Sequence, residues 1–174
     1  MRRPALIVID VQNDYFPGGA FPLWNPEAAL AATLRAIGAA QARGVPVILV
    51  QHVADAENGP APFFNAGTPG VAIHPEILAA APDAPVVVKR YADAFDDTGL
   101  EATLQALGVD ELLLCGMMTQ NCVTHTALSR RADVYRSVTV LGDACTTTSE
   151  AVHRIALTAL ARRVALATVD AALG

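Results

Sequence analysis

Three side chains with complementary chemistry follow apolar runs of this sequence. Asp10 and Lys89 each come directly after such a run, and Cys122 lies a few positions beyond a third. A carboxylate can accept a proton, a thiol that loses one becomes a nucleophile, and an ammonium stabilises negative charge beside it. Together these types predict covalent catalysis by cysteine. Singly they are less specific, because the only lysine among twelve basic residues also fits a preference for arginine codons, and the cysteine also fits a small buried residue.

Six apolar runs rich in Val, Ile and Leu have the length of strands. They cover residues 5–11, 45–50, 86–88, 109–115, 138–141 and 164–169. The runs are continuous rather than alternating, which is typical of parallel strands buried on both faces.

Segments with helical periodicity separate these runs. They are predicted at about 26–42, 98–107, 122–132 and 150–163. Asn25 and Pro26 supply a cap and a first-turn proline for the first helix, Gly44 ends it, and Ser149 begins the last. The alternation predicts a doubly wound, three-layer α/β/α fold with a mostly parallel sheet of about six strands.

The predicted fold explains how three distant residues can meet. Ligands of an open parallel sheet bind beyond the carboxyl ends of its strands, and Asp10, Lys89 and Cys122 would all lie at that edge. The segment 116–122 links a strand to a helix, so Cys122 is expected near a helix N-terminus, whose amides favour a thiolate. An ammonium at Lys89 is expected to lower the thiol pKa further.

Length and composition exclude several classes of protein. A chain of 174 residues suits one domain, predicted over 1–174. A net charge of −5 with scattered arginines argues against nucleic acid as a partner. The apolar runs are far shorter than the about 20 residues of a membrane span, so no membrane partner is predicted. Three cysteines fit neither a zinc pattern nor a disulfide framework and no secretory signal begins the chain, which favours the cytoplasm.

Three motifs, in order, resemble those of the isochorismatase-like cysteine hydrolases, which include nicotinamidases and related amidases. They are Asp-Val-Gln-Asn-Asp at 10–14 after a strand, Lys89 at the end of a later strand, and Gly-x-x-Thr-x-x-Cys-Val at 116–123. The resemblance extends over about 5–148 and includes Gly-Asp-Ala-Cys at 142–145.

The resemblance implies a catalytic triad that cleaves a C–N bond of a small molecule through a thioester. Asp10 would be the base, Lys89 the stabiliser of charge and Cys122 the nucleophile. It also implies a cis peptide bond at Met117–Met118, which turns the backbone amides of Met118 and Cys122 into an oxyanion hole. Assembly into a homo-oligomer, a dimer or larger, is a further implication.

The chain departs from metal-dependent nicotinamidases. Those enzymes carry Asp-x-His after the second strand and another histidine downstream, whereas this chain reads Gln-His-Val-Ala-Asp at 51–55. His52 and His74 remain, but no carboxylate–histidine pair has that spacing, so no metal or other cofactor is predicted. Nicotinamide is therefore disfavoured as the substrate. Isochorismate is disfavoured too, because its vinyl-ether hydrolases generally lack the cysteine.

A pocket for a small-molecule substrate is expected beside the triad. Its predicted lining is aromatic with few polar anchors, as is usual for such sites, and consists of Tyr15, Trp24, His52, Phe63 and Phe95. The Pro-, Gly- and Ala-rich segment 51–73 is too long for an ordinary connection and is predicted to set specificity.

The other histidines and cysteines receive structural interpretations. His125 is predicted to be a structural or subunit-contact residue rather than a partner of Cys122, and His153 a surface residue. Cys115 is predicted in the core, and Cys145 as a small buried residue.

Two other functions remain open. The same fold could cleave an ether or ester without covalent catalysis, with Asp10 as the acid and the thiol incidental. Alternatively, the chain could be a binding subunit that retains the pocket without turnover.

Overall fold

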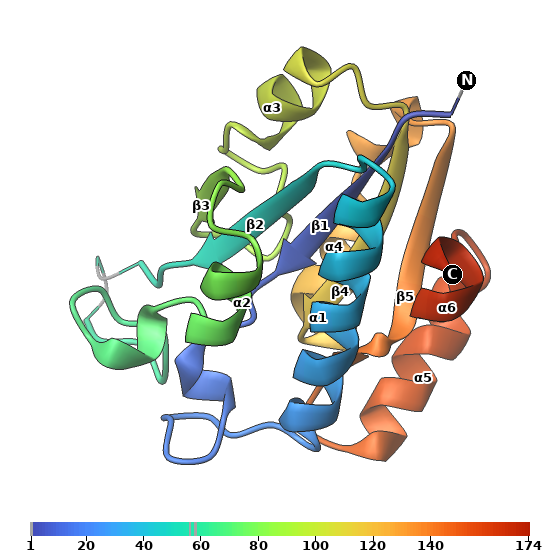
Figure 1. The fold of residues 1–174 in the computed structure, drawn as a ribbon. Coiled ribbons are helices and arrows are strands. Elements are labelled where there is room, and N and C mark those ends of the chain that lie inside the picture. Colours follow the sequence, from blue (N-terminus) through green and yellow to red (C-terminus); the bar gives the residue numbers. More distant parts are fainter. Residues whose placement is uncertain (1, 56, 58) are drawn as a thin grey trace.

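A six-stranded, all-parallel sheet forms the centre of the molecule (Figure 1). The computed structural model describes residues 2–55, 57 and 59–174; Met1 and two residues of the predicted specificity loop, 56 and 58, lie outside them. The strand order is β3-β2-β1-β4-β5-β6. The strands are β1 (Pro4–Ile9), β2 (Val47–His52), β3 (Val86–Lys89), β4 (Glu111–Met117), β5 (Ser137–Thr146) and β6 (Ala165–Ala167).

Helices cover both faces of the sheet, which confirms the predicted three-layer fold (Figure 1). They are α1 (Pro26–Ala42), α2 (Pro75–Ala80), α3 (Leu100–Ala106), α4 (Thr124–Ala127), α5 (Glu150–Leu160) and α6 (Val169–Leu173). On one face α1 contacts both α2 and α6, while α4 on the other contacts α5 and β5. None of the helices in the described part of the chain is long and apolar enough to cross a membrane.

The central strands carry the core. Every residue of β4 is buried, and so are the residues of β1 after Pro4, as the continuous apolar runs predict. The prediction of two buried faces is wrong for β3, where Val86 and Val88 are 46% and 52% exposed. It is also wrong for β6, where Leu166 is 38% exposed. These two strands are the edges of the sheet, where the covering layers are incomplete.

Two helix predictions need correction. Asn25 precedes α1 but makes no side-chain capping bond. The helix predicted over 122–132 is instead a π-helical turn, η3 (Thr119–Val123), followed by the single turn α4 and the later 3-10 turn η4 (Ala132–Val134). The hydroxyl of Thr124 donates to the Thr119 carbonyl at 2.6 Å, and such local bonds compete with regular helix geometry.

Gly116 allows β1 and β4 to converge at their carboxyl ends. It pairs with Ile9, has a φ of 120°, and a Cβ atom there would lie 2.0 Å from the Ile9 carbonyl oxygen. Only glycine fits so close an approach of two backbones. As a result, Asp10 and the chain leading into η3 leave the sheet side by side.

Candidate active site

The three predicted catalytic residues meet where the strand order reverses. Asp10 follows β1, and Cys122 lies in η3 beyond the neighbouring strand β4. Lys89 ends β3 and pairs in register with His52 at the end of β2. Open α/β sheets bind ligands outside the carboxyl ends of their strands at such a reversal.

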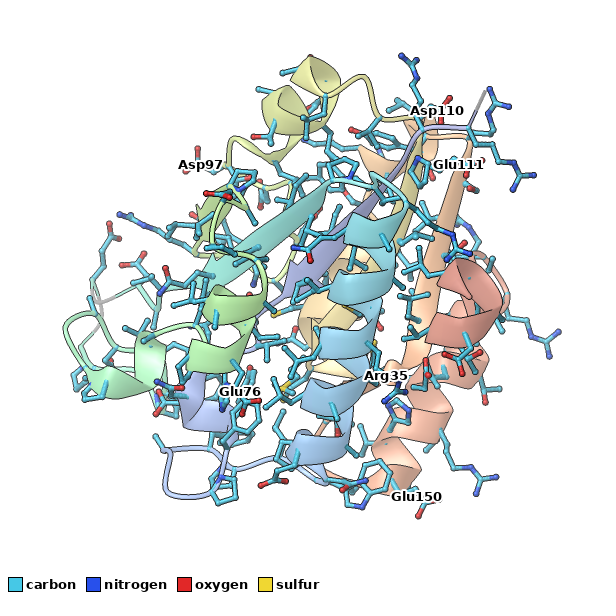
Figure 2. All side chains as sticks on the ribbon, in the orientation of Figure 1. Arg35, Glu76, Asp97, Asp110, Glu111 and Glu150 are labelled. Carbon is cyan, nitrogen blue, oxygen red and sulfur yellow. The ribbon has the colours of Figure 1, made fainter. Side chains whose placement is uncertain are left out.

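Lys89 joins the other two residues directly. Its Nζ lies 2.9 Å from Asp10 Oδ2 and 3.2 Å from Cys122 Sγ. All three residues are at most 1% exposed, whereas charged side chains such as Arg35, Glu76 and Glu150 lie on the periphery (Figure 2). An ammonium buried this completely requires a paired negative charge and full hydrogen bonding.

The Lys89 ammonium has two further acceptors. His52 Nδ1 lies 2.8 Å from Nζ, and the carbonyl oxygen of Tyr91 lies 3.0 Å from it. Burial alone would lower the pKa of Lys89, but the charge of Asp10, with Cys122 beside it, outweighs burial and raises that pKa. Lys89 therefore remains an ammonium at neutral pH.

The carboxylate oxygens of Asp10 are free to accept hydrogen bonds. Its carboxylate oxygens are the only buried side-chain polar atoms of the described residues that lack a hydrogen-bond partner, although Oδ2 forms the ion pair with Lys89. A buried carboxylate in that state is placed to accept a proton.

The pKa of Cys122 is raised, so the predicted lowering is wrong. Burial is the main cause and the charge of Asp10 the next, and together they outweigh the opposite effect of Lys89. The physical reason is charge balance, because one carboxylate and one ammonium already neutralise each other and a thiolate would add a net charge to a buried site. Cys122 also lies within the π-turn rather than at the N-terminus of a regular helix.

The backbone around the predicted oxyanion hole is tightly folded. The peptide bond between Met117 and Met118 is cis. The amides that flank that of Cys122, on Asn121 and Val123, both donate to the Met118 carbonyl, at 3.0 and 3.3 Å. This arrangement holds the amide of Cys122 and its side chain in one short turn.

Two histidines contact the η3 turn, one of them in a role that was not predicted. Thr119 Oγ1 lies 2.8 Å from His153 Nδ1, so His153 is a half-buried support of the nucleophile turn and not the surface residue predicted. His125 is exposed, and its Nδ1 lies 2.9 Å from the Asn121 carbonyl oxygen.

An aromatic wall made of Tyr15, Phe63 and Phe64 stands beside the triad. Ring centroids of Tyr15 lie 5.5 Å from Phe63 and 4.6 Å from Phe64, and Phe64 lies 5.8 Å from His52. Burial and then the charges of Asp10 and Cys122 raise the pKa of Tyr15, which places its hydroxyl in the electrostatic field of the triad. Phe64 was not predicted as a site residue.

Two predicted lining residues lie outside this wall. Trp24 is 37% exposed, and its ring centroid lies 6.0 Å from that of His153. Phe95 is buried with its ring 6.1 Å from that of Tyr135. Neither ring takes part in the aromatic contacts that surround Tyr15 and His52.

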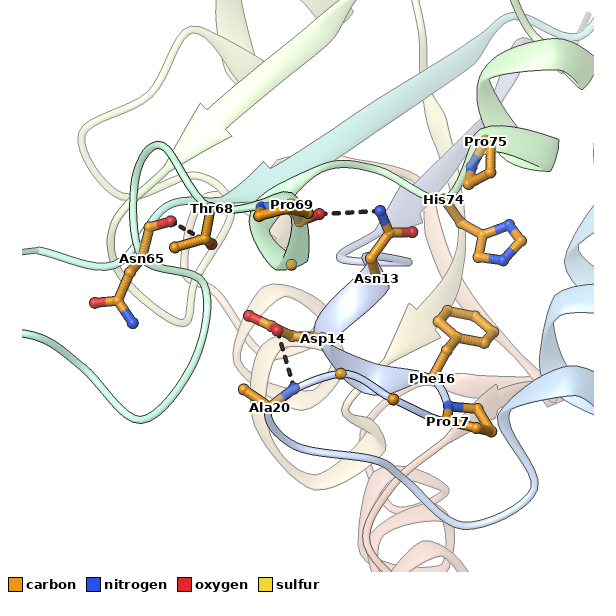
Figure 3. Close-up of a pocket in the computed structure, with 13 residues that line it drawn as sticks. Asn13, Asp14, Phe16, Pro17, Ala20, Asn65, Thr68, Pro69, His74 and Pro75 are labelled. Atoms are coloured by element: carbon orange, nitrogen blue, oxygen red, sulfur yellow. Dashed lines mark hydrogen bonds between the residues drawn. The ribbon is translucent and has the colours of Figure 1, made fainter.

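A pocket of about 650 Å³ opens near the wall but not onto the triad (Figure 3). Asn13, Phe16 and His74 are among its lining residues, and His74 Nδ1 accepts the Glu76 amide at the start of α2. The carboxylate of Asp14 accepts the backbone amides of Ala20 at 3.0 Å and Phe64 at 2.7 Å.

Asp14 therefore ties the pocket of Figure 3 to the aromatic wall. Gly70 leaves room for this carboxylate, since a Cβ atom there would lie 1.9 Å from Asp14 Oδ1.

Three residues of the site could in principle bind a metal ion, but Lys89 occupies the space that the ion would need. Ligand atoms of Asp10, His52 and Cys122 all lie within 4.8 Å of one another. However, Lys89 Nζ contacts each of them at 2.8 to 3.2 Å and fills the space between them. A zinc ion would need the same ligands at about 2.0 to 2.3 Å and would face the positive charge of the ammonium.

The comparisons with known proteins agree with this architecture. The family model for the isochorismatase domain matches residues 4–171. The chain belongs to the isochorismatase family. The isochorismatase family protein YddQ of Bacillus subtilis is 40% identical to it, over 83% of this chain and 78% of YddQ. A crystal structure of an isochorismatase hydrolase from Oleispira antarctica has a TM-score of 0.87 at 33% identity and covers 99% of this chain and 96% of its own.

Some relatives in this family are amidohydrolases. The maleamate amidohydrolase of Pseudomonas putida is 32% identical, over 80% of this chain and 70% of that enzyme. The chain thus belongs to a family of isochorismatase-like hydrolases that includes amidohydrolases.

Proposed function

We propose that this isochorismatase-family protein, acting as one domain over 1–174, is a cysteine-dependent hydrolase of small amides. The observation that carries the proposal is the position of the Lys89 ammonium, within 2.9 Å of the Asp10 carboxylate and 3.2 Å of the Cys122 sulfur. A thiol, a base with an unpartnered oxygen and a fixed cation are the groups that covalent amide hydrolysis requires.

The first half of the reaction forms a thioester. Asp10 takes the proton of Cys122, which leaves the total charge of the buried site unchanged, because the ammonium then faces a thiolate instead of a carboxylate. Sγ attacks the substrate carbonyl carbon, and the backbone amides of Met118 and Cys122 donate to the oxyanion that forms. As the C–N bond breaks, the protonated Asp10 gives its proton to the leaving nitrogen, so ammonia or an amine departs.

The second half releases the acid. Asp10, again a carboxylate, takes a proton from a water molecule that attacks the thioester carbonyl. The C–S bond breaks, the sulfur leaves as a thiolate beside Lys89, and Asp10 returns the proton to it. The carboxylic acid is released and the resting thiol is restored. No step needs a metal or another cofactor.

Substrate recognition is assigned to the groups that face the triad. Tyr15, His52 and Phe63 belong to the predicted lining and lie at or beside the aromatic wall, and Phe64 joins them. Such a wall suits a small, flat or unsaturated acyl group. The name of the Pseudomonas putida relative, a maleamate amidohydrolase, supports an amide of a short acid as the substrate class.

Trapping the thioester tests this proposal. A panel of short-chain primary amides is mixed with the enzyme, quenched in acid within one turnover and analysed by intact-protein and peptide mass spectrometry. An acyl adduct on the peptide that contains Cys122 is expected, with release of ammonia. Cys145→Ala is the matched control and should form the same adduct.

The alternatives predict different results in the same experiment. Turnover of an ester or ether by both the wild type and Cys122→Ala would indicate non-covalent hydrolysis. Binding of ligands without any product would indicate the non-catalytic subunit. Either result would contradict the covalent amidase.

A further inference from the structure

Three hydrogen-bond partners and the carboxylate of an ion pair surround the Lys89 ammonium. Asp10 Oδ2, His52 Nδ1, the Tyr91 carbonyl and Cys122 Sγ all lie within 3.2 Å of Nζ. An ammonium has three N–H groups. His52 Nδ1, at 2.8 Å, is the nearest of the four atoms to Nζ, so its ring belongs to this cluster and not merely to the pocket lining.

The contact with Lys89 determines which nitrogen of His52 carries the proton. An ammonium donates and cannot accept, so Nδ1 must offer its lone pair, and the neutral ring then holds its proton on Nε2. Burial, and after it the charge of Lys89, lowers the pKa of His52 against the opposing effect of Asp10, whose Oδ2 lies 4.0 Å from Nδ1. The ring is therefore a neutral donor at its Nε2.

Gln12 holds the backbone of His52 in place. It is fully buried, its Oε1 accepts the His52 amide at 2.8 Å, and its Nε2 donates to the His52 carbonyl at 2.8 Å and to the Val71 carbonyl at 2.7 Å. The Phe64 ring lies beside the imidazole. With the backbone and Nδ1 both fixed, the direction of the Nε2–H group is fixed as well.

The Nε2–H group of His52 has no acceptor among the residues that the structure describes. It is also absent from the buried unpartnered atoms of those residues, which all belong to Asp10, so it reaches accessible space. The His52 side chain is 20% exposed. A preorganised donor thus lies beside the buried triad and reaches the accessible surface.

We propose that His52 selects the substrate by donating its Nε2–H to an uncharged carbonyl oxygen in the acyl part, separate from the carbonyl that Cys122 attacks. An uncharged acceptor fits because the only ammonium of the cluster is already paired with Asp10, so a second carboxylate would be desolvated without a cation. The inference rests on the proposed amidase function and adds a specificity-determining residue and a substrate class to it.

A matched series of amides tests the selection. The probes are 4-oxopentanamide, pentanamide, which has a methylene in place of the ketone, and succinamate, which has a carboxylate there. Wild-type enzyme is expected to prefer 4-oxopentanamide over pentanamide in kcat/KM by about tenfold or more, the worth of one good hydrogen bond. Equal efficiencies for these two, or a preference for succinamate, would overturn the proposal.

Two substitutions distinguish the roles of the two ring nitrogens of His52. His52→Asn keeps an acceptor close to Nδ1 for Lys89 but removes the Nε2–H, so Cys122 alkylation should be unchanged while the preference for the ketone disappears, mainly through KM. His52→Leu removes the acceptor at Nδ1 as well as the Nε2–H donor, so both the rate of Cys122 alkylation and the preference for the ketone should change. Retention of the ketone preference in His52→Asn would contradict the role of Nε2.

A readout without turnover keeps this inference distinct from the amidase proposal. Nitrogen-15 NMR of labelled histidine in Cys122→Ala should show His52 as the neutral Nε2–H tautomer, with an Nε2 shift that moves more with 4-oxopentanamide than with pentanamide. If this response appears but the wild type hydrolyses no amide, the donor role stands and the amidase proposal fails. If amides are hydrolysed but the Nδ1–H tautomer or equal shifts are found, the donor role fails and the amidase proposal stands.

Discussion

Cys122 and Cys145 are both buried thiols. Cys122 follows β4 and Cys145 lies near the end of the adjacent strand β5, yet only Cys122 contacts both an ammonium and a carboxylate. Burial raises the pKa of Cys145 to about 12, while a bond from the Gly116 backbone lowers it and Asp143 adds a smaller rise. Burial also raises the pKa of Cys122, but there an ammonium lies 3.2 Å from the sulfur and a carboxylate adjoins both.

The difference separates burial from reactivity. A buried thiol without a nearby base and cation keeps its proton and remains inert, as Cys145 should. The thiol of Cys122 can transfer its proton to Asp10, because Lys89 stabilises the thiolate that forms. The partners of Cys122, rather than an acidic thiol at rest, are what distinguish the two regions.

Removing each thiol gives the sharpest contrast. Cys122→Ala should lower kcat/KM for any amide substrate by about 1000-fold or more, since the covalent route is lost. Cys145→Ala should leave kcat/KM near the wild-type value. Steady-state kinetics on both variants measure this, and comparable losses in the two would show that Cys122 acts only through packing.

The cation beside Cys122 provides the next contrast. Lys89→Met leaves the Asp10 carboxylate buried without a counter-charge and should lower the free energy of unfolding by about 3 to 5 kcal/mol. The exposed neighbour Arg90→Met is the control, expected within about 0.5 kcal/mol of wild type. Urea unfolding at pH 7 measures both, and equal stabilities would contradict the buried ion pair of Lys89 and Asp10.

The pH dependence of the free energy of unfolding tests the raised pKa that all three thiols share. Burial raises the pKa of Cys115, Cys122 and Cys145 in the folded state, so from about pH 8.5 upward the unfolded chain loses thiol protons that the folded chain keeps. The free energy of unfolding should therefore fall between pH 8.5 and 10, approaching about 1.4 kcal/mol per thiol for each pH unit. Cys145→Ala should remove one thiol's share of this slope; an unchanged slope would contradict its raised pKa.

Much of the fold follows from local pattern. Continuous apolar runs predicted the strands, and their alternation with helices predicted a parallel sheet, which in turn placed Asp10, Lys89 and Cys122 at one edge. The helix over 122–132 could not be predicted correctly, because the break depends on a hydroxyl bond from Thr124 back to Thr119. The short helices α2 and α6 were also missed.

The protonation behaviour of the site was harder to predict from the sequence than the identity of its residues. The raised pKa of Cys122 depends on complete burial and on the balance of charge between Asp10 and Lys89, and neither can be read from residue types alone. Phe64 enters the site because Asp14, an unassigned residue, holds its amide. The cytoplasmic location and the homo-oligomer, which depend on surroundings outside a single chain, stay predictions.

The central claim is that burial and the charge of Asp10 keep the proton on Cys122 at rest, and that Asp10 accepts this proton during turnover. The most direct measurement is the rate of Cys122 alkylation by iodoacetamide at pH 7.5, followed peptide by peptide in the wild type and in Asp10→Asn, with Cys115 and Cys145 as internal references. Removing the negative charge should lower the Cys122 pKa and speed its alkylation by about tenfold for each unit of pKa change, while amide turnover is lost. Slower or unchanged alkylation in Asp10→Asn, or turnover that survives the substitution, would contradict the account.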